Sequence, residues 1–193
     1  MAKDLKFRDL REEEIDCRVQ SMGVQKNDET KGWARCLLYK DARVDMNVLD
    51  ETVGSMNWQR KHEELKDNMY CAIGINMNFD DITKEPCWVW KQDCGAESFT
   101  EKEKGEASDS FKRAGFNWGI GRELYTKIPI MIYGLPVKGS SKGVAIDGSF
   151  EVEKIVIENK EIVALSLFFV KGAEKTRCFV WQKDKGVTQQ QCK

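Results

Sequence analysis

The chain has 193 residues, of which 41% are hydrophobic and 33% are charged, and its formal net charge is −1. A chain of this length suits one domain, or one domain with a small appendage, and can bury about 70% of its unfolded surface without covalent staples. The balanced charge excludes the strongly basic class of nucleic-acid binders. Any site for nucleic acid must therefore come from local clustering of lysine and arginine.

The ends and the cysteines indicate an intracellular protein. The first fourteen residues, MAKDLKFRDLREEE, have no apolar segment of the signal-peptide kind. No run approaches the ~18 apolar residues that span a bilayer. The seven cysteines are odd in number and form no CxxC pair, which is typical of free, buried thiols. We therefore expect a soluble, cytoplasmic protein that makes no membrane contact.

The first predicted elements are two strands and a helix. Residues 15–24 and 32–39 are predicted to form a hairpin. Residues 41–53 are predicted to form a helix, because their apolar side chains fall on one stripe at helical spacing. Asp41 fits the N-cap position of this helix, and Gly54 fits the position of a C-terminal glycine.

Three more strands and a second helix complete the first part of the chain. Residues 57–65, 69–76 and 86–93 are predicted to form a three-stranded antiparallel meander. The second helix ends near Asn117, before two glycines that break the helical pattern. The sequence thus predicts an α+β fold, in which an antiparallel β-meander packs against a long helix, with an additional C-terminal β-hairpin.

The predicted division of the chain has four parts. Residues 1–134 form the core, and residues 135–148, rich in Gly, Ser and Lys, form a flexible linker. Residues 149–182 form C-terminal β-strands that pack on the core or on a neighbouring protomer. Residues 183–193 form a disordered tail.

The second helix carries the first candidate binding site. An apolar stripe at i, i+3, i+4 and i+7 spacing is predicted to pack on the sheet, and it consists of Phe111, Ala114, Gly115 and Trp118. Lys112, Arg113 and Phe116 then point largely away from the sheet. Two cations beside an aromatic ring suit a nucleic-acid strand, because cations meet phosphates while the ring stacks on bases. The alternative is an ordinary solvated helix face.

Two further pairs of cations are candidates. Lys40 and Arg43 flank the start of the first helix, where a cation opposes the macrodipole at a cost of about 0.3–1 kcal/mol. A bound phosphate would relieve that cost, although the neighbouring Asp41 can also neutralise these cations. Arg60 and Lys61 lie on the strand at residues 57–65, where alternation places them on opposite faces.

Enzyme motifs are missing, so we expect neither catalysis nor a cofactor. The sequence has no HExxH and no GxxxxGK[ST] motif, and its single histidine, His62, has no partners at a recognisable spacing. Asp80 and Asp81 leave open the alternative of a metal-dependent nuclease. A non-catalytic protein-interaction module is the other alternative.

Two segments resemble a known family. Residues 104–125, KGEASDSFKRAGFNWGIGRELY, resemble the helix of the Rad-fifty-two superfamily of single-strand annealing proteins, especially its small phage members. Residues 40–58, KDARVDMNVLDETVGSMNW, look like an upstream helix of the same family. The two segments occur in the family's order, and the resemblance covers roughly residues 15–132.

This resemblance implies a β-β-β-α core and assembly into rings or helical filaments. DNA would lie in a basic groove with its backbone inward and its bases outward. By position, Arg43, Lys112 and Arg113 match the family's DNA-contacting cations, and Arg60 and Lys61 lie nearby in the sequence. Phe116 stands where some relatives carry another cation, so it would stack or pack instead.

The resulting prediction is a single-stranded DNA-binding and annealing protein for homologous recombination and DNA repair. It would act without ATP as an oligomeric ring or filament, in the cytoplasm of a bacterial host as a phage protein. Expected partners are single-stranded DNA, further copies of the chain, and a single-strand-binding protein or a recombinase. The predicted DNA-binding residues are Lys40, Arg43, Arg60, Lys61, Lys112, Arg113 and Phe116.

Overall fold

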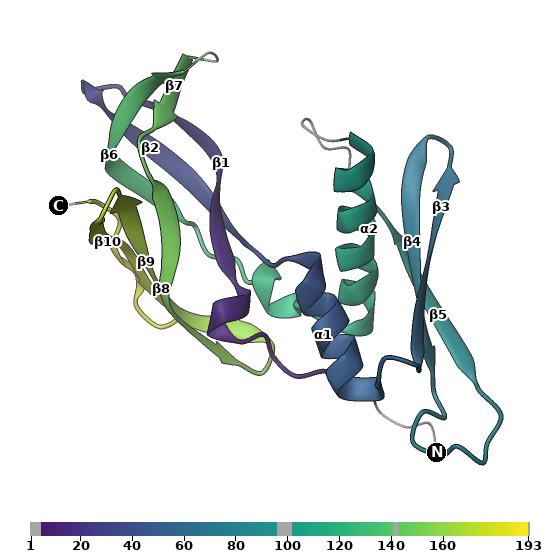
Figure 1. Ribbon diagram of the computed structural model, residues 1–193. Helices are drawn as coiled ribbons and strands as arrows, with labels where there is room; N and C mark the ends of the chain where they lie inside the picture. Colours follow the sequence, from purple (N-terminus) through teal and green to yellow (C-terminus); the bar gives the residue numbers. More distant parts are fainter. Residues whose placement is uncertain (1–4, 96–101, 141–142, 193) are drawn as a thin grey trace. The chain divides into compact units, whose positions relative to one another are not determined.

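The computed structural model describes residues 5–95, 102–140 and 143–192 (Figure 1). The chain divides into two compact units. Unit 1 comprises Met1–Asp9 and Asp41–Arg122, and unit 2 comprises Leu10–Lys40 and Glu123–Lys193. The described residues form antiparallel sheets and two α-helices, which confirms the predicted mixture of helix and antiparallel sheet.

The first helix of unit 1, α1 (Ala42–Val53), begins and ends as predicted. The Asp41 carboxylate accepts a hydrogen bond of 2.8 Å from the backbone N–H of Arg43, which satisfies one of the free donors at the helix start. Gly54 ends the helix with a φ of 84°, a backbone conformation that favours glycine.

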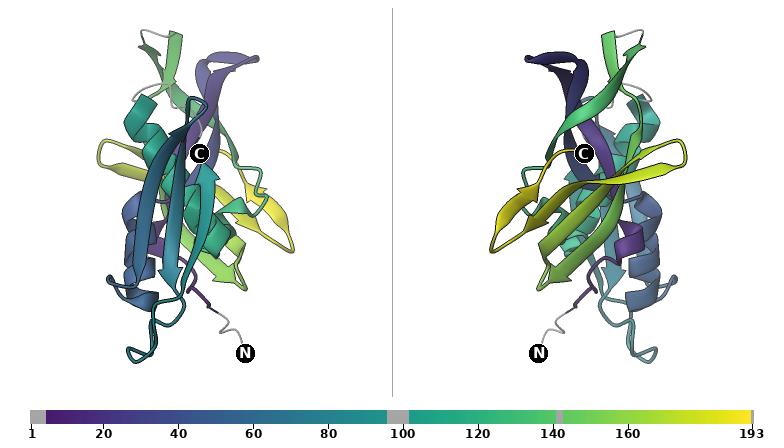
Figure 2. Two further views of the ribbon diagram at one scale, coloured as in Figure 1. Left: turned by 90° about the vertical axis from the view of Figure 1, so that its right-hand side faces the viewer. Right: turned by 90° about the vertical axis from the view of Figure 1, so that its left-hand side faces the viewer.

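A three-stranded antiparallel sheet follows α1 in unit 1 (Figure 2, left). Its strands are β3 (Trp58–Leu65), β4 (Asn68–Asn76) and β5 (Trp88–Cys94), paired in that order. Lys66 and Asp67 join β3 to β4 with φ angles of 51° and 60°, as in the two-residue turns that match the twist of a hairpin. The predicted meander is therefore confirmed.

The second helix, α2 (Lys102–Trp118), has 17 residues and lies alongside this sheet (Figure 1). The indole N–H of Trp118 donates to the carbonyl of Ile73 on β4 at 3.0 Å. The Phe111 ring stacks on Trp58 of β3 with 6.2 Å between the ring centroids. These contacts fix which surface of α2 is turned towards the strands.

Unit 2 contains two four-stranded antiparallel sheets (Figure 2, right). The first has the order β1-β2-β6-β7, and its strands are β1 (Asp16–Gln25), β2 (Asp28–Tyr39), β6 (Met131–Ser140) and β7 (Gly143–Ile146). The second has the order β11-β10-β9-β8, and its strands are β8 (Ser149–Glu158), β9 (Glu161–Lys171), β10 (Glu174–Gln182) and β11 (Gly186–Gln189). Short 3₁₀ helices occur at Glu12–Glu14 and Arg122–Tyr125. The predicted hairpins β1–β2 and β8–β9 are confirmed.

The sequence-based predictions for two irregular segments are wrong. Residues 135–148, expected to be a flexible linker, belong largely to β6 and β7, and Leu135 and Ile146 are buried there. The segment 183–193, expected to be disordered, contains β11, which pairs with β10. The strand β6 is ordered by pairing with β2, which is far away in the sequence, and local composition carries no signal of such pairing. The strand β11 forms a hairpin with the preceding strand β10.

All seven cysteines lie in described residues and have free thiols. Four of them are buried, as predicted: Cys17, Cys36, Cys71 and Cys178. Burial raises the pKa of the Cys71 thiol to about 11. Cys87, by contrast, is exposed.

Candidate nucleic-acid interface

One stripe of α2 is buried, and it is the stripe that the spacing predicted. Its members are Phe111, Ala114, Gly115 and Trp118. Gly115 faces α1, because a Cβ atom at this position would come within 2.4 Å of the Asp45 carboxylate. The predicted cations lie on the remaining surface of the helix, where Arg113 is exposed and Lys112 is half-buried.

Arg113 and Asn117 connect this surface of α2 to β5. The Arg113 Nε atom lies 3.3 Å from a carboxylate oxygen of Asp93. The Asn117 side-chain amide donates to the carbonyl of Gln92 at 3.0 Å and to Asp93 at 3.2 Å. Because β5 is an edge strand of its sheet, the guanidinium group lies at the rim, with 44% of the Arg113 side chain exposed.

Two more cations lie beside the end of α2. The Lys91 ammonium donates to the carbonyl of Asn117 at 3.0 Å, and the Arg122 guanidinium donates to the carbonyl of Phe116 at 3.1 Å. Carbonyls at a helix C-terminus lack intrahelical donors, so these cations satisfy them and complement the helix dipole.

Lys91 and Arg122 were missed by the sequence analysis, although strand alternation offered a signal for one of them. Lys91 and Asp93 are two residues apart on β5 and therefore share a face, and the apolar Val89 continues that face towards the helix. Lys91 lies 4.4 Å from the ring centroid of Trp118, a buried residue of α2. No comparable periodic signal marks Arg122, which follows the end of the helix.

Four cations and one ring lie on α2, on β5 and at Arg122. We name this set the α2 strip, and it consists of Lys91, Lys112, Arg113, Phe116 and Arg122. Arg122 lies 5.6 Å from the centroid of the Phe116 ring. Ammonium and guanidinium groups bind phosphate oxygens, and a phenyl ring offers a face to a nucleobase.

Arg43 and Lys40, the predicted cations of the first helix, differ in accessibility. Arg43 lies at the first turn of α1 with 87% of its side chain exposed, and its Nε atom is 3.9 Å from Asp41. Lys40 belongs to unit 2 and is only 5% exposed. A buried ammonium group is not open to a phosphate, so the structure does not support Lys40 as a DNA contact.

Arg60 and Lys61 lie on opposite faces of β3, as alternation predicted. The Arg60 guanidinium lies on the α2 side, 5.1 Å from the centroid of Phe111. The Lys61 ammonium lies 4.6 Å from the centroid of Trp90 on β5, on the face turned away from α2. The structure therefore does not bring Lys61 together with the α2 strip.

The residues considered for catalysis have structural partners. His62 lies 3.1 Å from the carbonyl of Ala107 on α2. The hydroxyl and backbone N–H of Thr83, with the ammonium of Lys84, hold the pKa of Asp81 at about 2. Within residues 5–95, 102–140 and 143–192, no group of three or more His, Cys, Asp or Glu side chains is arranged to hold a metal ion. In the same ranges, neither α-helix is long and apolar enough to cross a membrane.

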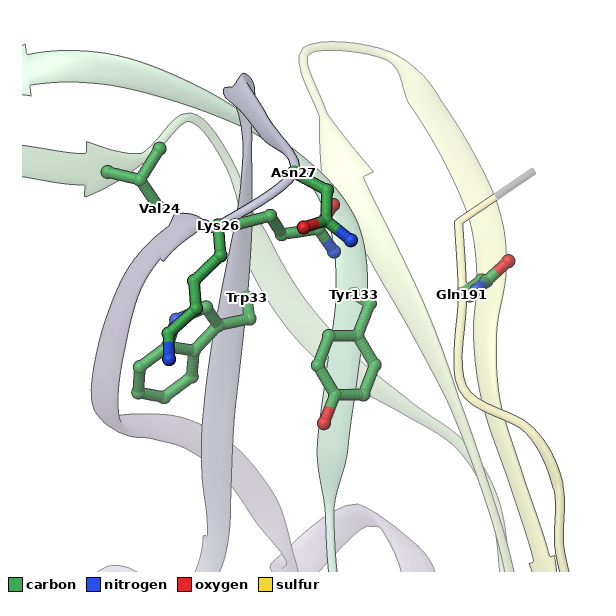
Figure 3. Close-up of a pocket in the computed structure, with 7 residues that line it drawn as sticks. Val24, Lys26, Asn27, Trp33, Tyr133 and Gln191 are labelled. Atoms are coloured by element: carbon green, nitrogen blue, oxygen red, sulfur yellow. The ribbon is translucent and has the colours of Figure 1, made fainter.

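Unit 2 has a surface pocket of about 370 Å³ near the turn between β1 and β2 (Figure 3). Its lining combines two aromatic rings with polar groups and consists of Val24, Gln25, Lys26, Asn27, Trp33, Tyr133 and Gln191. The Trp33 ring lies over Gly23 of the neighbouring strand, because a Cβ atom there would come within 2.9 Å of the indole nitrogen. None of these lining residues is among the predicted DNA contacts.

No protein-family model, no curated protein and no solved structure matches this chain.

Proposed function

We propose that this protein binds single-stranded DNA through the α2 strip and anneals complementary strands. The observation that carries the proposal is the pair Lys112-Arg113 beside Phe116 on α2, outside the buried stripe of this helix, where 44% of the Arg113 side chain is exposed next to the edge strand β5. In the resemblance to annealing proteins, this pair corresponds to DNA-contacting cations. Unit 1 would then be the β-β-β-α core of such a protein, with α2 as its helix.

The ion pair of Arg113 is compatible with phosphate binding. Arg113 and Asp93 are both partly exposed, and such surface pairs contribute about 0–1 kcal/mol. A phosphate offers the guanidinium two acceptor oxygens in a matching geometry, so it competes well with a single carboxylate contact. The near-neutral net charge of the chain is therefore compatible with local binding of a strand.

Binding by phosphates suits annealing because it leaves the bases accessible. A strand held by its backbone presents its base edges to a second strand, and pairing then needs no chemical step. Each phosphate contact contributes about −0.7 to the slope of log K against log salt for single strands. Weak contacts per protomer become tight binding when many protomers hold one strand, so we include a ring or filament of this chain in the proposal.

The rest of the proposal concerns the setting of this activity. The protein would act in homologous recombination and DNA repair, in the cytoplasm of a bacterial host. A single-strand-binding protein or a recombinase would be its partner there. It would use no ATP, no metal ion and no other cofactor.

Annealing of two complementary oligonucleotides labelled with a fluorescent donor and acceptor tests the proposal. We expect the protein to accelerate energy transfer in EDTA and without ATP, and the acceleration to weaken as salt is raised. Magnesium-dependent shortening of the oligonucleotides would favour the nuclease alternative. Failure to bind single strands even at low salt would contradict the proposal and leave the protein-interaction module as the better reading.

A further inference from the structure

The β3–β4–β5 sheet has one face that is turned away from α2 and towards the viewer in Figure 2, left. This face carries the aromatic pair Trp88 and Trp90. Side chains alternate along each strand, and Ile73 and Cys71 of β4 are buried on the α2 side. Ala72, Gly74 and Asn76, which alternate with these residues along β4, therefore face the other way. Opposite Gly74 lies Trp90, and opposite Asn76 lies Trp88.

The Trp90 ring lies flat on this face. A Cβ atom added at Gly74 would come within 2.6 Å of the Trp90 indole, so one side of the ring rests on the backbone of β4. Trp90 nevertheless remains 38% exposed. A ring held flat by the strand beneath it has already lost much of its rotational freedom, which lowers the entropy cost of stacking a ligand on it.

Trp88 and Lys61 extend the surface around Trp90. The centroids of the Trp88 and Trp90 rings are 6.2 Å apart, and their planes differ by 31°. This spacing follows from their positions two residues apart on one strand, which rises about 3.3 Å per residue. The Lys61 ammonium lies 4.6 Å from the Trp90 centroid, so a positive charge accompanies the exposed Trp90 ring and the half-buried Trp88 ring.

We propose that these three residues form a second contact for single-stranded nucleic acid, which holds the strand by its bases. Trp90 and Trp88 stack on successive bases, and Lys61 turns from the ring to a phosphate between them. The inference rests on the proposed function, because it takes single-stranded DNA as the ligand. It adds a mode of binding that differs from that of the α2 strip, where the cations hold the phosphates.

The chemistry of the surrounding face favours a nucleic-acid strand over a second copy of the chain. Interfaces between copies have apolar cores that are depleted of charge. Here the polar residues Gln59 and Gln92 and the charged Lys61 share this face with the rings. Exposed rings with amides and one cation match the alternation of apolar bases and anionic phosphates along a strand.

The test compares a labelled oligothymidine with an abasic oligonucleotide of the same length, because only the first can stack. Affinities are measured by fluorescence anisotropy for the wild type, Trp90→Leu and Trp90→Phe. Leucine still covers Gly74 but offers no aromatic face, whereas phenylalanine keeps one. We expect Trp90→Leu to weaken oligothymidine binding about 5- to 100-fold, while Trp90→Phe retains most of it.

Two readouts separate stacking from phosphate binding. Trp90→Leu should leave the abasic oligonucleotide's affinity and the slope of affinity against salt unchanged, whereas Lys112→Ala with Arg113→Ala should lower that slope. In the wild type, an oligonucleotide containing 5-iodouracil should photocrosslink to Trp88 or Trp90. If circular dichroism shows that Trp90→Leu does not fold, the crosslink alone tests whether Trp88 and Trp90 contact the bases.

The outcomes distinguish failure of this inference from failure of the proposed function. If the wild type binds both oligonucleotides equally and crosslinks only at residues of the α2 strip, the second contact is wrong and the proposed function stands. If Trp90→Leu loses binding but the α2 double variant does not, the second contact stands and the α2 strip is wrong. If the wild type binds neither oligonucleotide, both are wrong.

Discussion

Cations pair with carboxylates in both units, as Arg113 does with Asp93 in unit 1, and Arg18 of unit 2 lies over the Tyr39 ring. The two units differ in which kind of partner their sheets mainly provide. In unit 2, cross-strand carboxylates pair with the cations of the β8–β9–β10 sheet and its neighbours. These pairs are Lys175 with Glu151, Arg177 with Glu153, Lys183 with Glu161, and Lys171 and Lys138 with Asp147. In unit 1, several cations lie over aromatic rings instead: Arg60 over Phe111, Lys61 over Trp90, Lys91 over Trp118, and Arg122 over Phe116.

This difference matters because a carboxylate cancels a positive charge and a ring does not. Basic residues outnumber acidic ones in unit 2, whereas acidic residues are the more numerous in unit 1. The net charge alone would therefore predict that an anionic ligand binds to unit 2. The arrangement of the side chains favours unit 1, where the positive charge of the ring-bound cations is still available to a phosphate. We therefore expect the local pairing of cations, more than the net charge of each unit, to determine where an anion binds.

The largest expected effect comes from removing two cations of unit 1. Removal of two cations of unit 2 is the control. Lys112→Ala with Arg113→Ala should weaken binding to single-stranded DNA roughly 10- to 100-fold at low salt and lower the salt slope by about 1.4, because two phosphate contacts are lost. Lys175→Ala with Arg177→Ala removes the same charge from unit 2 and serves as the matched control. We expect this control to bind within about twofold of the wild type, as measured by fluorescence anisotropy. An equal loss in both variants would show that net charge, and not pairing, controls binding.

A smaller effect is expected from a methyl group placed between α1 and α2. A Cβ atom at Gly115 would lie 2.4 Å from the buried Asp45 carboxylate. Overpacking of this kind costs about 1–3 kcal/mol, which exceeds the gain of about 1 kcal/mol from replacing a helical glycine by alanine. Gly115→Ala should therefore lower the free energy of unfolding of unit 1 by about 1 kcal/mol, measured by urea unfolding of the helical circular dichroism signal.

Gly139 in unit 2 provides the control for this substitution. A Cβ atom there would meet nothing within 4 Å, so Gly139→Ala should leave the urea midpoint almost unchanged. A Gly115→Ala variant as stable as the wild type would mean that α1 and α2 can separate without cost. The position of Lys112 and Arg113 would then depend on the sheet alone.

The smallest expected effect is the acid sensitivity of the ion pairs in unit 2. Arg177 holds the pKa of Glu153 below its ordinary value of 4.5. A carboxyl group whose pKa is lowered by folding stabilises the folded state above its ordinary pKa, and this stabilisation is lost as the pH falls through the lowered value. Unit 2 should therefore lose stability as the pH falls below about 4.5.

Arg177→Gln tests the origin of this loss. Without its partner, Glu153 should titrate nearer its ordinary pKa, so the decrease in urea midpoint between neutral and acid pH should be smaller than in the wild type. The transition can be followed by the fluorescence of Trp181, which is buried in β10. An unchanged decrease would mean that other carboxylates are responsible, of which Asp147, paired with Lys171 and Lys138, is the first to test.

Elements with local signals could be predicted from the sequence. The N-cap of Asp41 and the terminal Gly54 define α1, and the tight turn at Lys66 and Asp67 defines the β3–β4 hairpin. These features depend on residues a few positions apart, so their physics is contained in a short segment. The opposite orientations of Arg60 and Lys61 follow from alternation in the same way.

Features that depend on distant pairing could not be predicted. The strands β6 and β7 are rich in Gly, Ser and Lys, yet β6 is ordered by its pairing with β2. The burial of Lys40 likewise comes from tertiary packing. Such contacts join residues whose proximity is determined only when the whole unit has folded.

The exposed thiol of Cys87 makes this chain ready for site-specific labelling. Cys87 directly precedes Trp88 at the start of β5, the strand that carries both Lys91 of the α2 strip and Trp90 of the opposite face. The buried Cys71, with a pKa of about 11, has little reactive thiolate at neutral pH. A maleimide dye attached at Cys87 should therefore report the arrival of a strand on either face.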